Sequence, residues 1–280
     1  MKLSDVLTPS FRLSGRELDL KVEVFEGRLV VIAPLWRRAL STESLFCRAV
    51  VSAGYLTEEQ MQHAARRYRL GRTRQGGVIF WQIDADGDIC DGKVMYYCED
   101  CHRDKQRHPT WVSTLLQRRY RWADAERMTT RHCFFGLHLL GSEKCRVKSE
   151  KFATAVHTKQ NSCNSFNSWL KNNIAVVESE KSAVILSEHF PQHVWLATGG
   201  LGNVQADKFR PLRGHRVTLF PDTDPDGKTF KAWYDAAQLV MQQPFWEDSP
   251  PITVSPLLEL HATEEQKRRK IDLVDYLFEK

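Results

Sequence analysis

The feature of this sequence that most constrains its fold is a strict alternation of strand and helix patterns over residues 173–245. Three short runs that are apolar throughout, except for Thr218 in the third, end at Val177, Ala197 and Phe220, and each is typical of a strand buried on both faces. Helix-like segments separate these runs, and a longer amphipathic helix pattern covers residues 227–241. Buried strands that alternate with helices are typical of a parallel sheet covered on both faces. The sequence therefore predicts an α/β fold here.

The whole chain divides into four predicted segments. They are residues 1–75, an N-terminal strand and helix region; 76–172, an α+β region; 173–245, the parallel-sheet domain; and 246–280, a connector with a C-terminal helix. The second segment is expected to open with a hairpin whose strands are residues 78–83 and 93–97. Capping-box spacings begin at Thr57 and Thr263 and predict two helix starts, the second opening one helix that runs to Phe278.

Charge placement suggests a polyanionic partner. The formal net charge is only +5, but arginines and lysines bunch between residues 66 and 131, with tryptophan and tyrosine among them. Cations interleaved with aromatic rings suit a nucleic acid, whose bases stack on the rings. The residues predicted to bind it are Arg118, Arg119 and Arg121. A solvated face on arginine-rich helices explains the same pattern equally well, so both interpretations stay open.

The sequence also bears on location and on zinc. No apolar run approaches the length of about 20 residues that a membrane span needs, and the start lacks the apolar core of a signal peptide. We therefore expect a cytoplasmic protein with no membrane partner and with its seven cysteines reduced. Cys98 and Cys101 form a C-x-x-C pair, but the chain has no second pair, so a structural zinc ion is not expected.

Carboxylates stand directly after two of the predicted parallel strands. Glu178 follows the first strand, and Asp222 and Asp224 follow the third. If those strands are neighbours, the three side chains converge at the carboxyl ends of the strands, where open parallel sheets bind ligands. Asp222 and Asp224 can face one ion, because alternate residues of an extended segment point the same way. Such oxygen donors favour Mg²⁺, or Mn²⁺ in its place.

Helix capping explains the same acidic residues without a metal. Asp and Glu are common just after strands because they cap the helix that follows. Asp224 or Asp226 can cap the helix predicted to begin at Gly227, and Glu180 falls in the first turn of its own helix. Spacing alone leaves both interpretations open.

Three segments in order resemble the motifs of toprim domains. They are residues 176–183, a strand ending in a glutamate; 195–200, a strand with a small-residue loop; and 220–227, a strand followed by D-x-D and a glycine. The chain looks most like the primase-like toprim proteins of mobile genetic elements, in which strands similar to residues 77–84 precede the toprim unit. The resemblance implies that Glu178 is the acid/base residue and that Asp222 and Asp224 hold magnesium.

The resemblance further implies metal-dependent phosphoryl transfer on nucleic acid, most specifically primase-like nucleotidyl transfer in replication or mobilisation of a mobile element. The residues expected to contact phosphate are Lys181, Thr198, Gly199 and Gly200. A toprim-type nuclease and a non-catalytic DNA-binding adaptor are the alternatives. The expected partners are single-stranded DNA or a primed template and a separate helicase or mobilisation protein. A self-sufficient primase is not expected, because no C-x-x-C pair precedes Cys98 and no P-loop follows the toprim-like unit.

Overall fold

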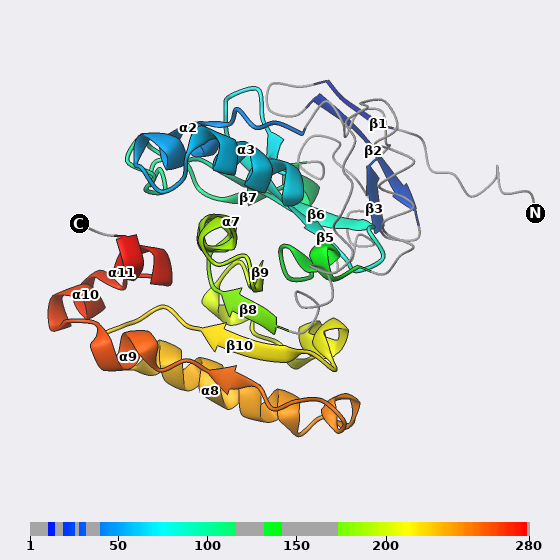
Figure 1. Cartoon of the computed structure of the whole chain (residues 1–280). Coiled ribbons are helices and arrows are strands. Elements are labelled where there is room, and N and C mark those ends of the chain that lie inside the picture. The colour runs from blue at the N-terminus through cyan, green and yellow to red at the C-terminus, as the bar shows by residue number, and fades with distance from the viewer. Residues whose placement is uncertain are drawn as a thin grey trace, which may run out of the picture. The chain divides into compact units, whose positions relative to one another are not determined.

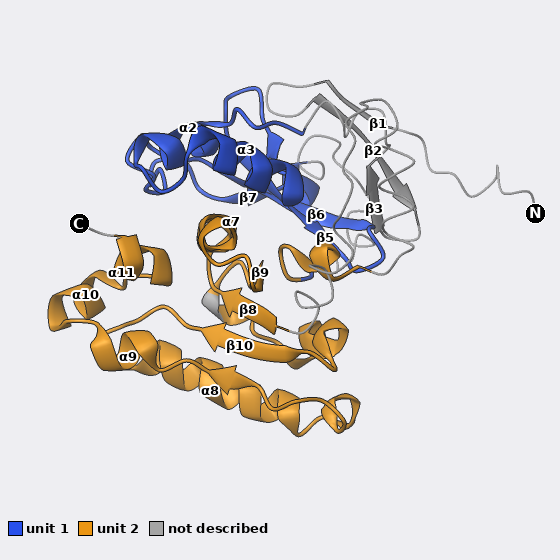
Figure 2. Ribbon diagram, viewed as in Figure 1, with its two compact units in different colours: residues 1–133 blue, residues 134–280 orange. Residues whose placement is uncertain are grey.

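The computed structural model describes residues 40–115, 132–141 and 173–278, together with the backbone of three strands nearer the N-terminus. The chain divides into two compact units, residues 1–133 and 134–280 (Figure 2). The three N-terminal strands form an antiparallel sheet and are β1 (Phe11–Ser14), β2 (Asp19–Phe25) and β3 (Arg28–Val31). The four-segment division predicted from the sequence stays a prediction.

The described part of the first unit contains two helices and an antiparallel sheet of order β4-β5-β6-β7. Its elements are α2 (Leu45–Ser52), α3 (Glu58–Arg67), β4 (Gly71–Arg72), β5 (Val78–Ile83), β6 (Ile89–Met95) and β7 (Thr110–Trp111). The predicted hairpin is confirmed as β5 and β6, although β6 begins at residue 89 and ends at residue 95 and not at 93 and 97 as predicted. Asp84 closes the turn, since its carboxylate accepts the Asp86 and Asp88 amides at 3.0 and 2.9 Å. Thr57 caps α3 through the predicted capping box.

Large aromatic side chains fill the core of the first unit. Phe46 of α2 meets Phe80 of β5 edge to face, with ring centroids 5.3 Å apart, and both side chains are fully buried. The indole of Trp81 lies over Gly92 of β6 on the neighbouring strand. A Cβ at residue 92 would lie 2.7 Å from Trp81 Cε3 and 2.9 Å from Ile79 Cγ2. Glycine at this position is therefore required by the close approach of the indole.

The second unit contains the predicted parallel sheet, with strand order β11-β10-β8-β9, of which β10, β8 and β9 are labelled in Figure 1. Its strands are β8 (Asn173–Val177), β9 (Val194–Ala197), β10 (Arg216–Phe220) and β11 (Thr253–Val254), and every pair is parallel. The helices α7 (Glu180–His189) and α8 (Lys228–Met241) flank the sheet. Short 3-10 helices complete the connections at η3 (Leu137–Leu140), η4 (Leu201–Asn203), η5 (Ala206–Leu212) and η6 (Pro244–Trp246). The predicted α/β fold is confirmed.

The end of the chain differs from the single helix that the sequence analysis expects. The structure has three short helices there: α9 (Leu257–His261), α10 (Glu264–Arg269) and α11 (Leu273–Phe278). Thr263 does open a helix with a capping box, but Lys270 adopts a left-handed conformation with φ of 56° and ends it. The break places Asp272 at the start of a separate helix. Among the described residues, no helix is long and apolar enough to cross a membrane.

Replacing Gly92 with alanine is expected to destabilise the protein by about 1–3 kcal/mol, because the new methyl group overlaps the buried Trp81 ring. Urea unfolding at neutral pH measures this change. The control is Gly202→Ala, since a Cβ at Gly202 meets no atom within 4 Å. Equal midpoints for the two variants would contradict the packing described for Trp81.

Candidate functional site

The parallel pairing of β8 with β10 brings two predicted site residues to one edge of the sheet. The two strands are direct neighbours, and Val177 stands opposite Phe220 at their carboxyl ends. Glu178 directly follows β8, and Asp222 lies two residues beyond the end of β10. The condition for convergence is therefore met, and the ionisation of Asp222 is affected by the charge of Glu178.

The loop after β9 holds the backbone of Glu178. The Thr198 amide donates to the Val177 carbonyl at 3.0 Å, and the Gly199 amide donates to the Glu178 carbonyl at 2.9 Å. Gly199 has φ of 76°, a left-handed conformation that glycine adopts without strain. The Gly200 amide in turn donates to the Thr198 hydroxyl at 3.3 Å. These amides fix the position of Glu178, while the predicted role of this loop in phosphate binding stays a prediction.

Asp222 carries the strongest electrostatic signal at this edge. Burial raises the pKa of its carboxyl well above the ordinary value, and the negative charges of Asp272, Glu178 and Asp275 raise it further. The ammonium of Lys181 opposes this shift but does not cancel it. The region around Asp222 therefore has an excess of negative charge, and a cation placed there would relieve it.

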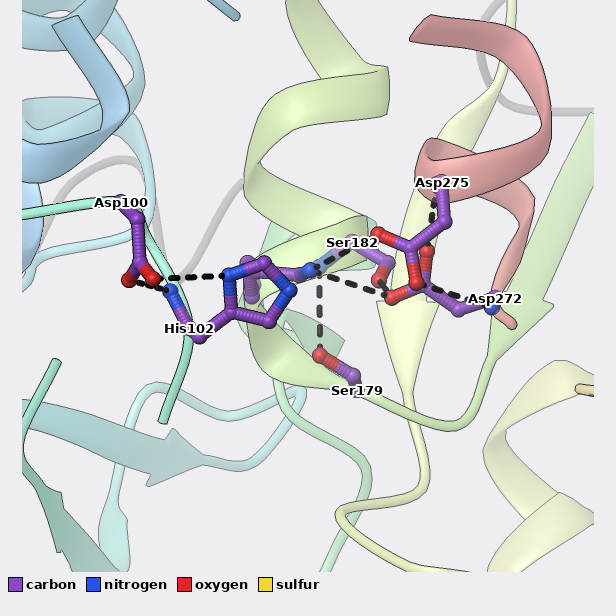
Figure 3. Close-up of polar contacts among 7 residues, drawn as sticks. Asp100, His102, Ser179, Ser182, Asp272 and Asp275 are labelled. Atoms are coloured by element: carbon purple, nitrogen blue, oxygen red, sulfur yellow. Dashed lines mark hydrogen bonds and ion pairs between the residues drawn. The ribbon is translucent and has the colours of Figure 1, made fainter. Parts of the chain in front are cut away.

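Two of these acidic residues, neither of them predicted from the sequence, lie at α11: Asp272 directly precedes the helix and Asp275 lies within it. Asp272 and Asp275 lie beside the start of α7, together with Ser179 and Ser182 (Figure 3). The Ser182 hydroxyl donates to Asp272 Oδ2 at 2.7 Å, and the Asp275 amide donates to Asp272 Oδ1 at 2.9 Å. Asp272 thus links α11 to α7. The available signal was the D-x-x-D spacing after Ile271, which is compatible with a helix start, but the single-helix prediction concealed it.

The side chain of Lys181, which was predicted to contact phosphate, forms ion pairs with two aspartates of the protein itself. Its ammonium lies 3.5 Å from Asp272 Oδ2 and 3.5 Å from Asp275 Oδ1. Only 13% of the side chain is exposed, so the two ion pairs are weakly screened by solvent. Lys181 therefore acts in the structure as the counter-ion that joins α7 to α11, and its predicted contact with phosphate stays a prediction.

Asp224 caps helix α8 instead of sharing the charged cluster of Asp222. Its Oδ1 accepts the amides of Asp226 and Lys228 at 2.9 and 3.2 Å, and its Oδ2 accepts the Thr229 amide at 2.6 Å. Burial acts to raise the pKa of Asp224, but these hydrogen bonds outweigh burial and lower it to about 2. Capping, the alternative noted for this residue, is therefore observed, and metal binding by Asp224 stays a prediction.

The remaining residues noted in the sequence differ in how far they are buried. Glu180 is buried in the first turn of α7, whereas Asp226 is exposed and pairs with Lys228. Cys101 is buried and Cys98 exposed in a tight loop. Arg118, Arg119 and Arg121 lie outside the described residues.

The donor set fits a magnesium ion that is held by few protein ligands. Within the described parts of the chain, no three His, Cys, Asp or Glu side chains are arranged to hold a metal by themselves. Mg²⁺ usually keeps several waters and binds one or two carboxylates together with substrate phosphates. Glu178 and Asp222 supply such a pair, and the excess negative charge around Asp222 favours a cation there.

The fold and this edge define a parallel α/β protein with a carboxylate pair at the ends of two adjacent strands. The chain belongs to the family described as "Domain of unknown function (DUF6371)", whose model matches residues 46–170 and 163–223. The match includes Glu178 and Asp222 and ends before Asp224, so α8 and α11 lie beyond it.

No curated protein matches the chain. Among solved structures, the chain is similar to the crystal structure of the primase fragment of the Bacteriophage T7 primase-helicase protein. The two are 18% identical, the similarity covers 81% of this chain and 73% of that chain, and the TM-score is 0.38. A similarity of this size does not support an inference about function.

Replacing Asp224 with alanine is expected to destabilise the protein by about 2 kcal/mol at pH 7, because α8 loses its cap. The pKa of about 2 in the folded state lies below the ordinary 3.8. The ionised carboxylate therefore stabilises the fold above pH 4, and this contribution is lost as the pH falls towards 2. Urea unfolding from pH 7 to pH 2.5 should show the difference from wild type narrowing below pH 4.

The control for this experiment is Asp226→Ala, which removes an exposed carboxylate two residues away. It is expected to change stability by less than about 0.5 kcal/mol. A constant gap between Asp224→Ala and wild type over the whole pH range would contradict the capping role.

Proposed function

We propose that this protein catalyses metal-dependent phosphoryl transfer on nucleic acid, with primase-like nucleotidyl transfer as the favoured reaction. The observation that carries the proposal is that Glu178 and Asp222 follow two adjacent parallel strands at the same edge of the sheet, where the charge of Glu178 acts on Asp222 within an excess of negative charge. Ligand sites of open parallel sheets lie at this edge. The resemblance of the three sequence motifs to toprim domains supports nucleic-acid phosphodiesters as the substrate class.

Asp222 and Glu178 are the residues that would hold Mg²⁺. When bound, the ion neutralises charge on the reacting phosphate and orients it. Glu178 is assigned the transfer of a proton to or from the reacting hydroxyl. The Thr198 and Gly199 amides hold the backbone at Val177 and Glu178, so the main chain that carries the Glu178 carboxylate is fixed at the edge of the sheet. Lys181 and Asp272 support this edge by joining α7 to α11.

A second candidate function, a non-catalytic DNA-binding adaptor, is favoured by a separate observation. Asp224 caps α8 with both carboxylate oxygens, and Lys181 pairs with two aspartates of the protein. Two residues assigned to chemistry from the sequence therefore have structural roles. An adaptor would bind single-stranded DNA without turnover. A nuclease would use the same carboxylate pair, and the length of the product distinguishes it from a primase.

Replacing Glu178 with glutamine is expected to lower metal-dependent turnover by about 100-fold or more, because the acid/base group is lost. The assay follows labelled nucleotides on single-stranded DNA with Mg²⁺ or Mn²⁺. Lengthened products indicate a primase, and shortened DNA indicates a nuclease. The control, Glu188→Gln on the last turns of α7, is expected to keep wild-type turnover. Turnover absent from wild type, with DNA binding intact, would reject catalysis in favour of the adaptor.

Mg²⁺ is expected to raise the melting temperature of wild type but not of Asp222→Asn. A ligand present at 100 times its dissociation constant stabilises the folded state by about 2.7 kcal/mol. Without divalent ions at pH 8, Asp222→Asn should melt above wild type, because the raised pKa means that ionised Asp222 destabilises the fold. Asp226→Asn serves as the control and should respond to Mg²⁺ as wild type does. An equal response from Asp222→Asn would exclude Asp222 as a ligand.

A further inference from the structure

Two loops of the first unit carry exposed cations that are separated in the sequence. The first loop follows β4 and the second connects β6 to β7. The exposed cationic residues of these loops and of the end of β4 are Arg72, Arg74, Arg103, Lys105 and Arg107. The second loop is not uniformly positive, because it also carries the acidic residues Glu99, Asp100 and Asp104. Asp104 lies 3.6 Å from Arg107, and Asp100 lies 3.4 Å from His102. Neither loop alone gathers many cations, so a joint surface requires that the fold bring the two loops together.

Tyr96, the residue after β6, joins the two loops. Its hydroxyl lies 3.4 Å from the Thr73 hydroxyl and 3.5 Å from Gln75 Oε1, both on the first loop. On the second loop, the guanidinium carbon of Arg107 lies over the Tyr96 ring, 4.5 Å from its centroid. One buried aromatic side chain therefore contacts both cationic segments.

Close packing and backbone hydrogen bonds fix this arrangement. A Cβ at Gly77 would lie 2.7 Å from the Tyr96 ring, so the ring packs directly on the backbone of the first loop. The Asp104 amide donates to the Tyr96 carbonyl at 2.9 Å, and Tyr97 forms a β-bridge with Arg103. The cations of both loops are thus presented from anchored segments, which lowers the entropy lost when a ligand orders them.

The contacts of Arg107 leave it able to bind a phosphate. Its side chain is 47% exposed, and stacking on Tyr96 uses the flat face of the guanidinium while its N–H groups lie around the edge. The ion pair with Asp104 involves Nε and leaves the terminal nitrogens for other acceptors. Arg72 is similarly 38% exposed, and its distance of 3.9 Å from Glu43 makes that ion pair a weak one.

We propose that the five exposed cations of the two segments joined by Tyr96, here called the Tyr96 surface, bind the phosphodiester backbone of a single nucleic-acid strand. The choice of nucleic acid as ligand rests on the proposed function. Arginine is suited to phosphate because its planar guanidinium donates two parallel hydrogen bonds. Tyr96 itself is buried beneath Arg107, so the surface offers charge and not an open ring, and binding is independent of base sequence.

The test replaces Arg103, Lys105 and Arg107 with glutamine in the full chain. Binding of two labelled single-stranded DNA 20-mers of unrelated sequence is measured by fluorescence anisotropy in EDTA over a range of salt. If each cation neutralises one phosphate, the slope of log affinity against log salt falls by about 2, since each contact to a single strand contributes about 0.7. The same relation predicts a loss of affinity of about 100-fold at 0.1 M salt for both 20-mers.

The matched control removes the same charge from the second unit by replacing Arg210, Arg213 and Arg216, which are also exposed. Arg210 is a close counterpart of Arg107, since it lies 4.3 Å from the centroid of the Phe245 ring and 3.1 Å from Asp207. The control should keep most of the wild-type affinity. Thermal unfolding confirms that both variants are folded.

The outcomes separate the Tyr96 surface from the proposed catalysis, because EDTA prevents metal-dependent turnover. Loss of binding in the first variant alone supports the surface, whatever the turnover assay shows. Equal losses in both variants, or no loss in either, overturn it while leaving the proposed function to the Glu178→Gln assay. Absence of binding by wild type also overturns it. Tighter binding to duplex than to single strands would overturn the assignment to a single strand.

Discussion

The candidate site depends on one interaction, the parallel pairing of β8 with β10. Hydrogen bonds between these strands bring residues about 40 positions apart in the sequence, Val177 and Phe220, into direct opposition. Everything at the carboxyl edge follows from this register. Glu178 and Asp222 leave the sheet at the same edge, the loop after β9 fixes Glu178 from one side, and α7 begins directly afterwards. Without the pairing, the acidic residues would be unrelated loop positions.

The same edge combines two opposed electrostatic arrangements. Asp224 is surrounded by amide donors, which favour its ionised form and lower its pKa. The ionised form of Asp222, two residues earlier, is disfavoured first by burial and then by the negative charges of Asp272, Glu178 and Asp275, so its pKa is raised. Asp224 therefore stabilises the start of α8, whereas ionised Asp222 lowers the stability of the fold. Charged groups held in this way are commonly found at functional sites.

Local patterns were sufficient to predict most of the second unit. Apolar strand runs, helix spacing and capping boxes are properties of neighbouring residues, and they placed β8, β9, β10 and α8 within a few residues of their positions in the structure. The neighbouring positions of β8 and β10 could be stated only as a condition, because pairing joins distant segments. Asp272 and Asp275 were missed for the same reason, since their relation to Lys181 depends on how α11 packs on α7. The fate of Asp224 was also undecided, because capping and metal binding use the same residue type at the same spacing.

The register between β8 and β10 has a consequence for how sequences of this family can diverge. Successive residues of a strand point to opposite faces, so adding or deleting one residue within β10 would turn its side chains over and displace Asp222 from Glu178. Substitutions that keep an apolar residue would leave the register unchanged. The two strands are therefore expected to tolerate exchange of side chains but not a change of length, and gaps between relatives should fall in the connecting loops.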